Sequence, residues 1–239
     1  MISKRILLKL SGETLIGDQS FGIHQHACMQ VASYIQKIHQ LGIEIGIVIG
    51  GGNIFRGINL RMMGMPRTPA DHMGMLATLL NGIALQQALI SQGLKVCVMS
   101  ALECAKVAEP YNWAKALQYL AEGCIIIFVG GTGNPYFTTD TAAALRASEI
   151  QANILMKATK VDGVYNKDPL KYSDAIKYEK ISYSRILAEK LQVMDATAIA
   201  LCRSSQIPIF VFNMHRLIEE DMKQTLTDFR HGTLIEENE

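Results

Sequence analysis

The sequence predicts an α/β fold, a three-layer α/β/α sandwich with a mostly parallel central sheet. Short apolar segments rich in β-branched residues alternate along the chain with longer segments of helical periodicity. The apolar segments, such as Cys124 to Val129, are continuous, as expected for strands buried on both faces. The main glycine clusters follow directly after such strands, at the edge where parallel sheets bind ligands.

Length and composition fit one domain over residues 1–239. The chain is 49% hydrophobic and 19% charged, which allows a sizeable core and leaves apolar surface for contacts between subunits. With 23 basic and 22 acidic residues, the net charge of +1 predicts no nucleic-acid partner. No stretch approaches a signal peptide or a membrane span, so we expect a cytoplasmic protein without a membrane partner. The five cysteines lack metal-binding spacing and are interpreted as reduced core thiols.

The first half of the chain predicts four strands, each followed by a helix. The strands are expected at Arg5 to Leu10, Ile43 to Ile49, Leu94 to Met99 and Cys124 to Val129. The helices are expected at His26 to Leu41, Asp71 to Gln92, Tyr111 to Ala121 and Thr141 to Glu149. Trp113 is expected in the core, and the second helix is expected to bury a face that includes Leu76 and Leu80.

The second half continues the alternation. Strands are expected at Ala152 to Lys157, Pro208 to Phe212 and Thr233 to Ile235. Helices are expected at Tyr183 to Leu191, Asp195 to Ser205 and His215 to Lys223. Between the first of these strands and the first of these helices lies a long, turn-rich excursion, residues 158–169, which is a suitable place to hold a base.

Two strand ends carry cations beside glycines. Lys9 lies near the end of the first strand, before Ser11-Gly12; such a lysine usually has an anionic partner, although it can also reach solvent. Three consecutive glycines, residues 50–52, follow the second strand and favour close backbone approach to an anion. Arg56 follows within reach and can clamp a phosphate, whereas Arg67 is expected on the surface.

The central stretch combines a strand, a glycine loop and a helix start. The loop Gly130 to Gly133 follows the fourth strand, and Thr138-Thr139-Asp140 precedes a helix rich in small residues. Free N–H groups and the helix dipole favour phosphate there. The alternative is an ordinary turn with Thr139 or Asp140 as the N-cap. For Asp71 the two readings are likewise an N-cap and an acceptor for a ribose hydroxyl.

The residues indicate direct phosphoryl transfer. No GxxxxGK[ST], no complete GxGxxG and no nucleophile, metal-ligand or protein-kinase set occurs. The glycine-rich strand ends remain, together with four charged candidates: Lys9, Arg56, Asp140 and Lys157. Such groups stabilise charge on phosphates without a covalent intermediate. In the excursion, Tyr165 can stack on a base and Asp168 can accept hydrogen bonds, or the segment is a plain loop.

An ordered set of motifs resembles the bacterial uridylate (UMP) kinases of the amino acid kinase superfamily. The motifs are KLSGE, IGGGNIFRG, DHMGMLAT, GTGNPYFTTD, KATKVDGVY and VMDATA, spread over residues 9–198. The likeness extends over residues 5–235. KLSG and the glycine loops are shared widely in the superfamily, whereas DHMGMLAT and GTGNPYFTTD are specific to the uridylate branch. The resemblance implies the amino acid kinase fold and the conversion of UMP to UDP with ATP and Mg²⁺.

The resemblance also assigns the substrates to residues, with the acceptor-binding part at about 1–150 and the ATP-binding part at about 151–239. ATP would be held by Lys9, Leu10, Ser11, Gly12, Gly52, Arg56, Thr159, Tyr165 and Asp168. UMP would be held by Gly51, Asp71, Thr132, Gly133, Asn134, Pro135, Tyr136, Phe137, Thr138 and Thr139. No metal ligand is expected from the protein, because ATP would carry the Mg²⁺.

Assembly and regulation follow from the same resemblance. It implies a homohexamer that is inhibited by UTP and often activated by GTP. No arginine occurs between Arg67 and Arg146, and the positions matched to GTP-binding arginines are Gln86, Cys97 and Cys124. We therefore expect GTP to activate weakly or to bind through other contacts.

Two other functions compete with this one. A carboxylate or carbamate kinase of the superfamily would share the ATP half but would have a different acceptor loop. A non-catalytic nucleotide-binding or oxyanion-binding assembly would not need the charged set Lys9, Arg56 and Asp140.

Overall fold

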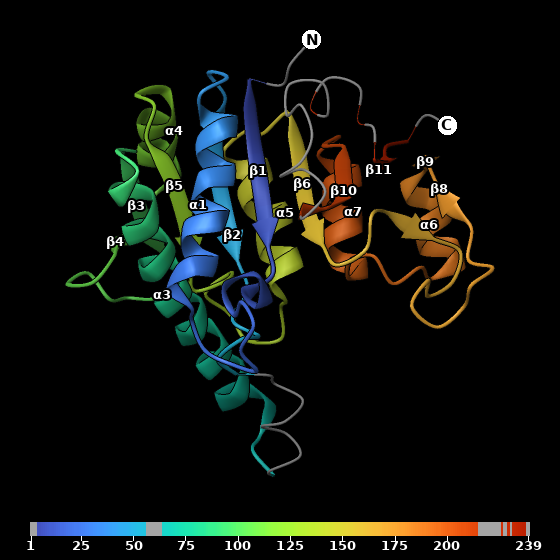
Figure 1. Ribbon diagram of the computed structural model, residues 1–239, viewed down its shortest axis with the longest axis horizontal. Helices are drawn as coiled ribbons and strands as arrows, with labels where there is room; N and C mark the ends of the chain where they lie inside the picture. The colour runs from blue at the N-terminus through green and yellow to red at the C-terminus, as the bar shows by residue number, and fades with distance from the viewer. Residues whose placement is uncertain (1–3, 56–63, 215–225, 227–228, 230, 238–239) are drawn as a thin grey trace.

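The computed structural model describes residues 4–55, 64–214, 226, 229 and 231–237. Arg56 and the expected helix from His215 to Lys223 lie outside the described residues. The chain forms layers of helices on both sides of a central sheet (Figure 1). This arrangement confirms the predicted fold class.

The central sheet has nine strands in the order β4-β3-β5-β2-β1-β6-β10-β11-β9. Every neighbouring pair is parallel except β10 with β11. The strands are β1 (Arg5–Leu10), β2 (Glu44–Ile49), β3 (Val96–Ser100), β4 (Glu109–Pro110), β5 (Ile125–Val129), β6 (Ile154–Thr159), β9 (Lys180–Ile181), β10 (Ile209–Asn213) and β11 (Gly232–Ile235). A separate two-stranded hairpin pairs β7 (Val164–Tyr165) with β8 (Lys177–Tyr178). The short strands β4, β7, β8 and β9 were not predicted, since two residues carry no periodicity.

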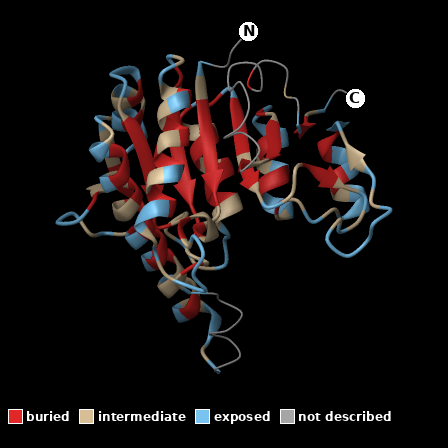
Figure 2. Ribbon diagram, in the orientation of Figure 1, coloured by how far each residue is buried: buried red, intermediate tan, exposed pale blue. Residues whose placement is uncertain are grey.

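The helices cover the sheet in two layers, and a core lies under each. The first layer holds α1 (Gln25–His39) and α3 (Arg67–Ser91), and the second holds α4 (Trp113–Ala121), α5 (Thr139–Glu149), α6 (Tyr183–Glu189) and α7 (Ala196–Ser204). Alternate residues of β1 point to opposite faces, so Ile6 and Leu8 join the first core while Leu7 joins the second. The central strands are therefore buried along most of their length, and β5 along all of it (Figure 2).

Helix α3 differs from its prediction in two respects. It begins at Arg67, four residues before Asp71, and the residue before it, Pro66, makes no side-chain cap. Of the residues expected on one apolar face, Leu79 and Leu89 are buried, whereas Leu76 and Leu80 are 52% and 51% exposed. By length and composition alone this helix could cross a membrane, contrary to the expectation that no stretch approaches a span, but half of its most apolar window is buried. Packing against the sheet and α1 accounts for that buried half.

Two other expectations about the core are wrong. Trp113 is 57% exposed at the start of α4, because the buried face of that helix is formed by Ala116 and Leu120. All five cysteines are free, as expected, but Cys97 and Cys124 are only half-buried, whereas Cys28 and Cys202 lie in the core.

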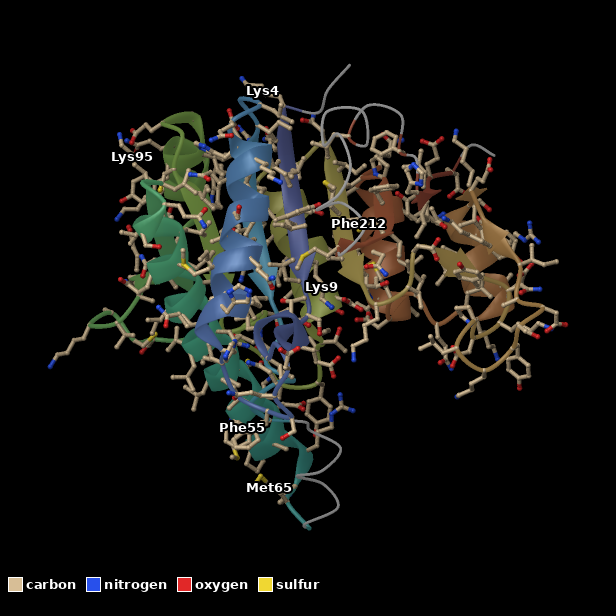
Figure 3. All side chains as sticks on the ribbon, viewed as in Figure 1. Lys4, Lys9, Phe55, Met65, Lys95 and Phe212 are labelled. Carbon is tan, nitrogen blue, oxygen red and sulfur yellow. The ribbon has the colours of Figure 1, made fainter. Side chains whose placement is uncertain are left out.

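The strand order places the functional groups. The chain adds β2, β3 and β5 on one side of β1, and then returns to place β6 and β10 on the other side. Ligands of open α/β sheets bind at such a reversal, beside the carboxyl ends of the strands. In the register of β1 with β6, Lys9 lies opposite Lys157. Figure 3 shows Lys9 at the carboxyl end of β1.

Candidate functional site

A carboxylate between two lysines forms the centre of the site. The Lys9 Nζ lies 2.7 Å from Asp140 Oδ1, and the Lys157 Nζ donates to Asp140 Oδ2 at 2.7 Å. Lys157 also donates to the Val193 carbonyl at 2.5 Å. The three charged side chains are only 11%, 15% and 12% exposed, in the order Lys9, Asp140, Lys157. Lys9 therefore has the anionic partner that the sequence predicted.

The pKa values of this cluster follow from burial and mutual charge. Burial alone would raise the pKa of Asp140, but the ammonium groups of Lys9 and Lys157 outweigh it and hold the pKa below its ordinary value. Burial lowers the pKa of Lys157, and Asp140 offsets only part of that effect. Asp140 is therefore an anion that fixes two cations, and it is unsuited to accept a proton at neutral pH.

The glycines that follow β1 and β2 differ in what surrounds them. A Cβ on Gly12 would lie 2.3 Å from Asn53 Oδ1 and 2.5 Å from the Gly50 carbonyl, so this turn packs directly on the next loop. A Cβ on Gly51 would lie 2.8 Å from Ala77 Cβ, so packing against α3 explains this glycine without a ligand. Among the described residues, no atom lies within 4 Å of the corresponding position on Gly52, which leaves room there for a ligand.

The third glycine loop leads into the N-terminus of α5. Gly130, Gly131 and Gly133 have φ of +77°, +60° and +83°, a region that glycine adopts readily. Thr138, not Thr139 or Asp140, is the N-cap, and its Oγ1 accepts the Asp140 N–H at 3.0 Å. Helix α5 starts at Thr139, so Asp140 lies in its first turn.

Asp71 holds the same loop from the other side. Its Oδ2 accepts the Tyr136 N–H at 2.7 Å, and Arg67 Nε lies 3.2 Å from the same oxygen. Arg67 also donates to the Tyr136 carbonyl at 3.1 Å, and its guanidinium lies over the tyrosine ring. Tyr136 has a φ of +76°, which is rare for a residue with a side chain. Asp71 is thus not an N-cap, and Arg67, expected to be plain surface, braces a strained loop.

The remaining loop residues are exposed or half-buried. Thr132 Oγ1 accepts the Asn134 N–H at 3.2 Å, which closes a tight local turn. Tyr136 and Phe137 are 62% and 51% exposed, so their rings are available to a ligand. Pro135 is half-buried between them and Asn134.

A pocket of about 600 Å³ lies beside Lys157. Its lining includes Thr159, Tyr165 and Asp168, the three residues expected to bind adenosine. Thr159 Oγ1 donates to the Val161 carbonyl at 2.6 Å, and Tyr165 donates to Asp162 at 2.6 Å, so the excursion is an ordered structure. The pocket and the glycine loops therefore meet at the lysine cluster.

Sequence reasoning missed the role of Asp195 in this cluster. Its carboxylate accepts hydrogen bonds from Thr138 Oγ1 and, at 2.9 Å, from Thr141 Oγ1, and it also caps α7 through the Ala198 N–H at 2.8 Å. Asp195 thus joins α5 to α7. The sequence signals only the cap, because an aspartate directly before the helical segment in VMDATA is typical of an N-cap.

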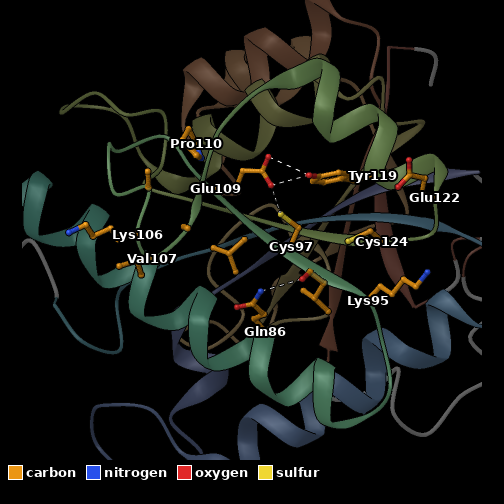
Figure 4. A pocket seen from close by; sticks show the side chains of 14 residues that line it. Gln86, Lys95, Cys97, Lys106, Val107, Glu109, Pro110, Tyr119, Glu122 and Cys124 are labelled. Carbon is orange, nitrogen blue, oxygen red and sulfur yellow. Dashed lines mark hydrogen bonds between the residues drawn. The ribbon is translucent and has the colours of Figure 1, made fainter.

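A second pocket, of about 650 Å³, lies away from this site. It brings together Gln86, Cys97 and Cys124, and its lining also includes Lys95, Lys106 and Glu109 but no arginine (Figure 4). Burial and a hydrogen bond to Glu109 raise the pKa of Cys97 to about 12, so its thiol stays protonated. The three positions matched to a GTP site thus share one pocket.

The geometry suits charge stabilisation on phosphates. Two ammonium groups, three loop backbones and a helix N-terminus converge at the carboxyl ends of adjacent strands. Among the described residues, no three His, Cys, Asp or Glu side chains come together to hold a metal ion. Both oxygens of Asp140 are already engaged by lysines.

Comparisons with known proteins agree with these features. The sequence profile described as "Amino acid kinase family" matches residues 4–213. A uridylate kinase of Protochlamydia amoebophila is 75% identical over 236 residues, which cover 99% of this chain and 94% of that protein. A uridylate kinase of Roseobacter denitrificans is 53% identical over 211 residues, 88% of this chain and 87% of that protein. The crystal structure of a UMP kinase from Bacillus anthracis superposes with a TM-score of 0.94 at 37% identity, covering 100% of this chain and 98% of that one.

Proposed function

This chain belongs to the amino acid kinase family, and on that premise we propose that it transfers the γ-phosphoryl group of ATP to UMP, a step of pyrimidine nucleotide biosynthesis. The observation that carries the proposal is the Lys9–Asp140–Lys157 cluster between the glycine loops and the pocket beside Lys157. The relatives named uridylate kinase support the choice of acceptor.

The transfer is a direct in-line displacement. An oxygen of the UMP phosphate forms a bond to the γ-phosphorus, the bond from that phosphorus to the β–γ bridging oxygen breaks, and ADP leaves with the electron pair. The second pKa of a phosphate monoester is about 6, so the acceptor oxygen is already ionised at neutral pH and needs no general base. The obstacle is repulsion between two polyanions, and the ammonium groups of Lys9 and Lys157 offset it.

The substrates divide along the sheet, with the acceptor-binding part at about 1–150 and the ATP-binding part at about 151–239. ATP phosphates lie along Lys9 to Gly12 and Gly52, and adenosine lies by Thr159, Tyr165 and Asp168. UMP lies between Asp71 and the loop Thr132 to Thr139, with Gly51 at its edge. Arg56 would add a further cation on the phosphates. Mg²⁺ would arrive with ATP and would neutralise phosphate charge, because no metal ligand is expected from the protein and both oxygens of Asp140 face lysines.

An ADP-release assay tests this function. Purified protein is incubated with ATP, Mg²⁺ and one acceptor at a time: UMP, CMP, carbamate or N-acetylglutamate. We expect turnover with UMP and a lower kcat/KM with CMP. Turnover with carbamate or N-acetylglutamate alone would identify a carboxylate or carbamate kinase. If none of the four acceptors yields ADP although nucleotide binding is measured, the result would favour a non-catalytic binding assembly.

Assembly and location complete the proposal. The protein acts in the cytoplasm as a homohexamer, and UTP inhibits it at the acceptor site. The exposed apolar side chains on α3, Leu76, Leu80 and Ile90, support an assembly, because a monomer would leave them in water.

GTP is expected to activate this enzyme weakly. GTP carries about four negative charges, and sites that bind polyphosphates use several arginines. The pocket around Gln86, Cys97 and Cys124 has two lysines and two glutamates in its lining, Lys95, Lys106, Glu109 and Glu122, which cancel in charge. Titration of GTP at fixed UMP measures the effect. Strong activation at micromolar GTP would show that other residues supply the missing charge.

A further inference from the structure

We infer that Thr78 and Asn81 of α3 are positioning residues that set the spacing between two glycine loops of the site. They contact neither lysine of the cluster, and their polar atoms bind the backbone of the loops instead. The inference rests on the proposed function, because it concerns the loops that would hold ATP and UMP phosphates.

Asn81 fixes the loop after β2. Its side chain is fully buried, and its Nδ2 donates to the Gly50 carbonyl and to Asn53 Oδ1, both at 2.7 Å. Asn53 returns a hydrogen bond to Asn81 Oδ1 at 2.9 Å and donates to the Gly22 carbonyl at 2.9 Å. This amide pair fills the space that Gly12 leaves by lacking a Cβ. Asn81 therefore holds the loop after β2 directly, and through its partner Asn53 it is linked to the loop that ends at Gly22.

Thr78 fixes the loop after β5. Its Oγ1 accepts the Gly130 N–H at 2.8 Å and donates to the Met75 carbonyl at 2.6 Å, and the side chain is 2% exposed. Gly130 is the first residue of the loop that leads to Thr138 and Asp140. The bond therefore fixes the point at which that loop leaves the sheet.

The two residues act through one rigid element. They are three residues apart, so they are neighbours on one face of α3. A buried amide or hydroxyl costs free energy unless it is hydrogen-bonded, and apolar residues would serve a purely structural helix at this depth. Each residue makes one hydrogen bond to the backbone of a strand-end loop, Asn81 to the Gly50 carbonyl and Thr78 to the Gly130 N–H. The helix thus works as a spacer between a loop of the donor side and a loop of the acceptor side.

Amide hydrogen exchange tests the inference without relying on turnover. Thr78→Val removes the hydroxyl at constant shape, and we expect faster exchange at Gly130 with little change at Gly22, Gly50 and Ile54. Asn81→Leu removes the amide, and we expect faster exchange at Gly22, Gly50 and Ile54 with little change at Gly130. Leu85→Ala is the matched control, because Leu85 is buried on the same helix and has no polar contact with a loop. It should lower Tm without this selective pattern.

Kinetics test the consequence for transfer. A misplacement of about 1 Å can reduce a rate by about 100-fold. We expect kcat to fall by about 10- to 100-fold in Thr78→Val and Asn81→Leu at a temperature where both are folded, with a smaller change in KM. Thr78→Ser, which keeps the hydroxyl, should restore most of the rate. The Leu85→Ala control should keep the kcat of the unaltered enzyme.

Two results would overturn the inference. One is a uniform increase in amide exchange rates throughout α3 and both loops in the two variants, which would mean that the residues merely stabilise the fold. The other is an unchanged kcat in both variants of an enzyme that otherwise turns over UMP. If the unaltered protein fails to phosphorylate UMP, the proposed function is wrong, and the exchange pattern still decides whether the helix spaces the loops.

Discussion

The residues Lys9, Asp140 and Lys157 place two largely buried ammonium groups on either side of one carboxylate. The Asp195 carboxylate also favours the charged form of Lys157, so both cations are held by neighbouring anions. A preorganised cation in a site with little water stabilises developing phosphate charge more strongly than one in solvent. Asp140 keeps the two lysines from repelling each other before substrate arrives.

Replacing Lys9 tests whether its positive charge contributes to phosphoryl transfer. We expect Lys9→Ala to lower kcat by about 100- to 1000-fold, because one preorganised donor on the transferred group is lost. The fold should survive, since Lys9 belongs to neither apolar core. Steady-state kinetics and circular dichroism measure both effects. Turnover near that of the unaltered protein would remove Lys9 from the mechanism.

Asp140 also makes stability depend on pH. Its pKa in the folded protein lies below the value of about 3.9 for the unfolded chain, so its contribution is present above that value and is lost as pH falls through the folded pKa. We expect the unfolding free energy of the unaltered protein to exceed that of Asp140→Asn at pH 7, and the difference to shrink below about pH 4. Urea denaturation over a pH series measures it. A difference that stays constant would contradict the assignment.

Part of the residue-level site could be predicted and part could not. Lys9 and Asp140 stand out because a charge beside a glycine turn, or at the start of a small-residue helix, is locally unusual. The bonds of Asp195 to Thr138 and Thr141 span 57 and 54 residues, and no local pattern reports such contacts. The same holds for Asp71, whose partner Tyr136 lies 65 residues away.

At the scale of elements, α3 approaches β5 closely at Gly82. A Cβ on Gly82 would lie 2.4 Å from Val129 Cγ1, and Val129 is stiff and buried. Helix propensity favours alanine over glycine by about 1 kcal/mol, whereas overpacking a core costs about 1–3 kcal/mol. We expect Gly82→Ala to lower the free energy of unfolding by up to about 2 kcal/mol. Urea denaturation checks the sign.

A second variant separates the two effects. Adding Val129→Ala to Gly82→Ala removes the methyl group that a Cβ would strike, so the double variant should cost less than the sum of the single changes. A single Gly82→Ala variant more stable than the unaltered protein would show that helix propensity dominates.

The existence of the long elements was predictable, whereas their ends and exposed faces were not. Continuous apolar runs and helical stripes located the main strands of the described residues and α1, α3, α4, α5, α6 and α7. The start of α3 was missed because Pro66 gives no side-chain cap there. Trp113, Leu76 and Leu80 were assigned to the core because periodicity locates an apolar face without saying what covers it.

At the scale of the whole molecule, those exposed apolar residues bear on assembly. Leu76 and Leu80 lie one turn apart on α3, so they form one apolar strip. We expect Leu80→Glu to shift the protein to smaller assemblies, because a charge in a buried interface loses its hydration. Sedimentation velocity measures the change. Ile176→Glu, an equally polar change at a residue 65% exposed on the β7–β8 segment, is the control.

Two outcomes would contradict the prediction for Leu80→Glu. An unchanged sedimentation profile for Leu80→Glu would show that this strip does not hold subunits together. Equal effects of both substitutions would indicate a general loss of solubility.

The adjacency of β1 and β6 also determines when the site can form. The hydrogen-bonded residues Arg5 and Asn153, at the start of the two strands, are 148 residues apart in the chain. Contacts that close long loops form late in folding, and chains fold from the N-terminus as they are synthesised. A nascent chain that has not reached Ile154 can pair β1 with β2 but carries neither Lys157 nor the pocket beside it. A chain that ends between Asp140 and Ile154 therefore contains two of the three charged residues of the cluster before the third has been synthesised.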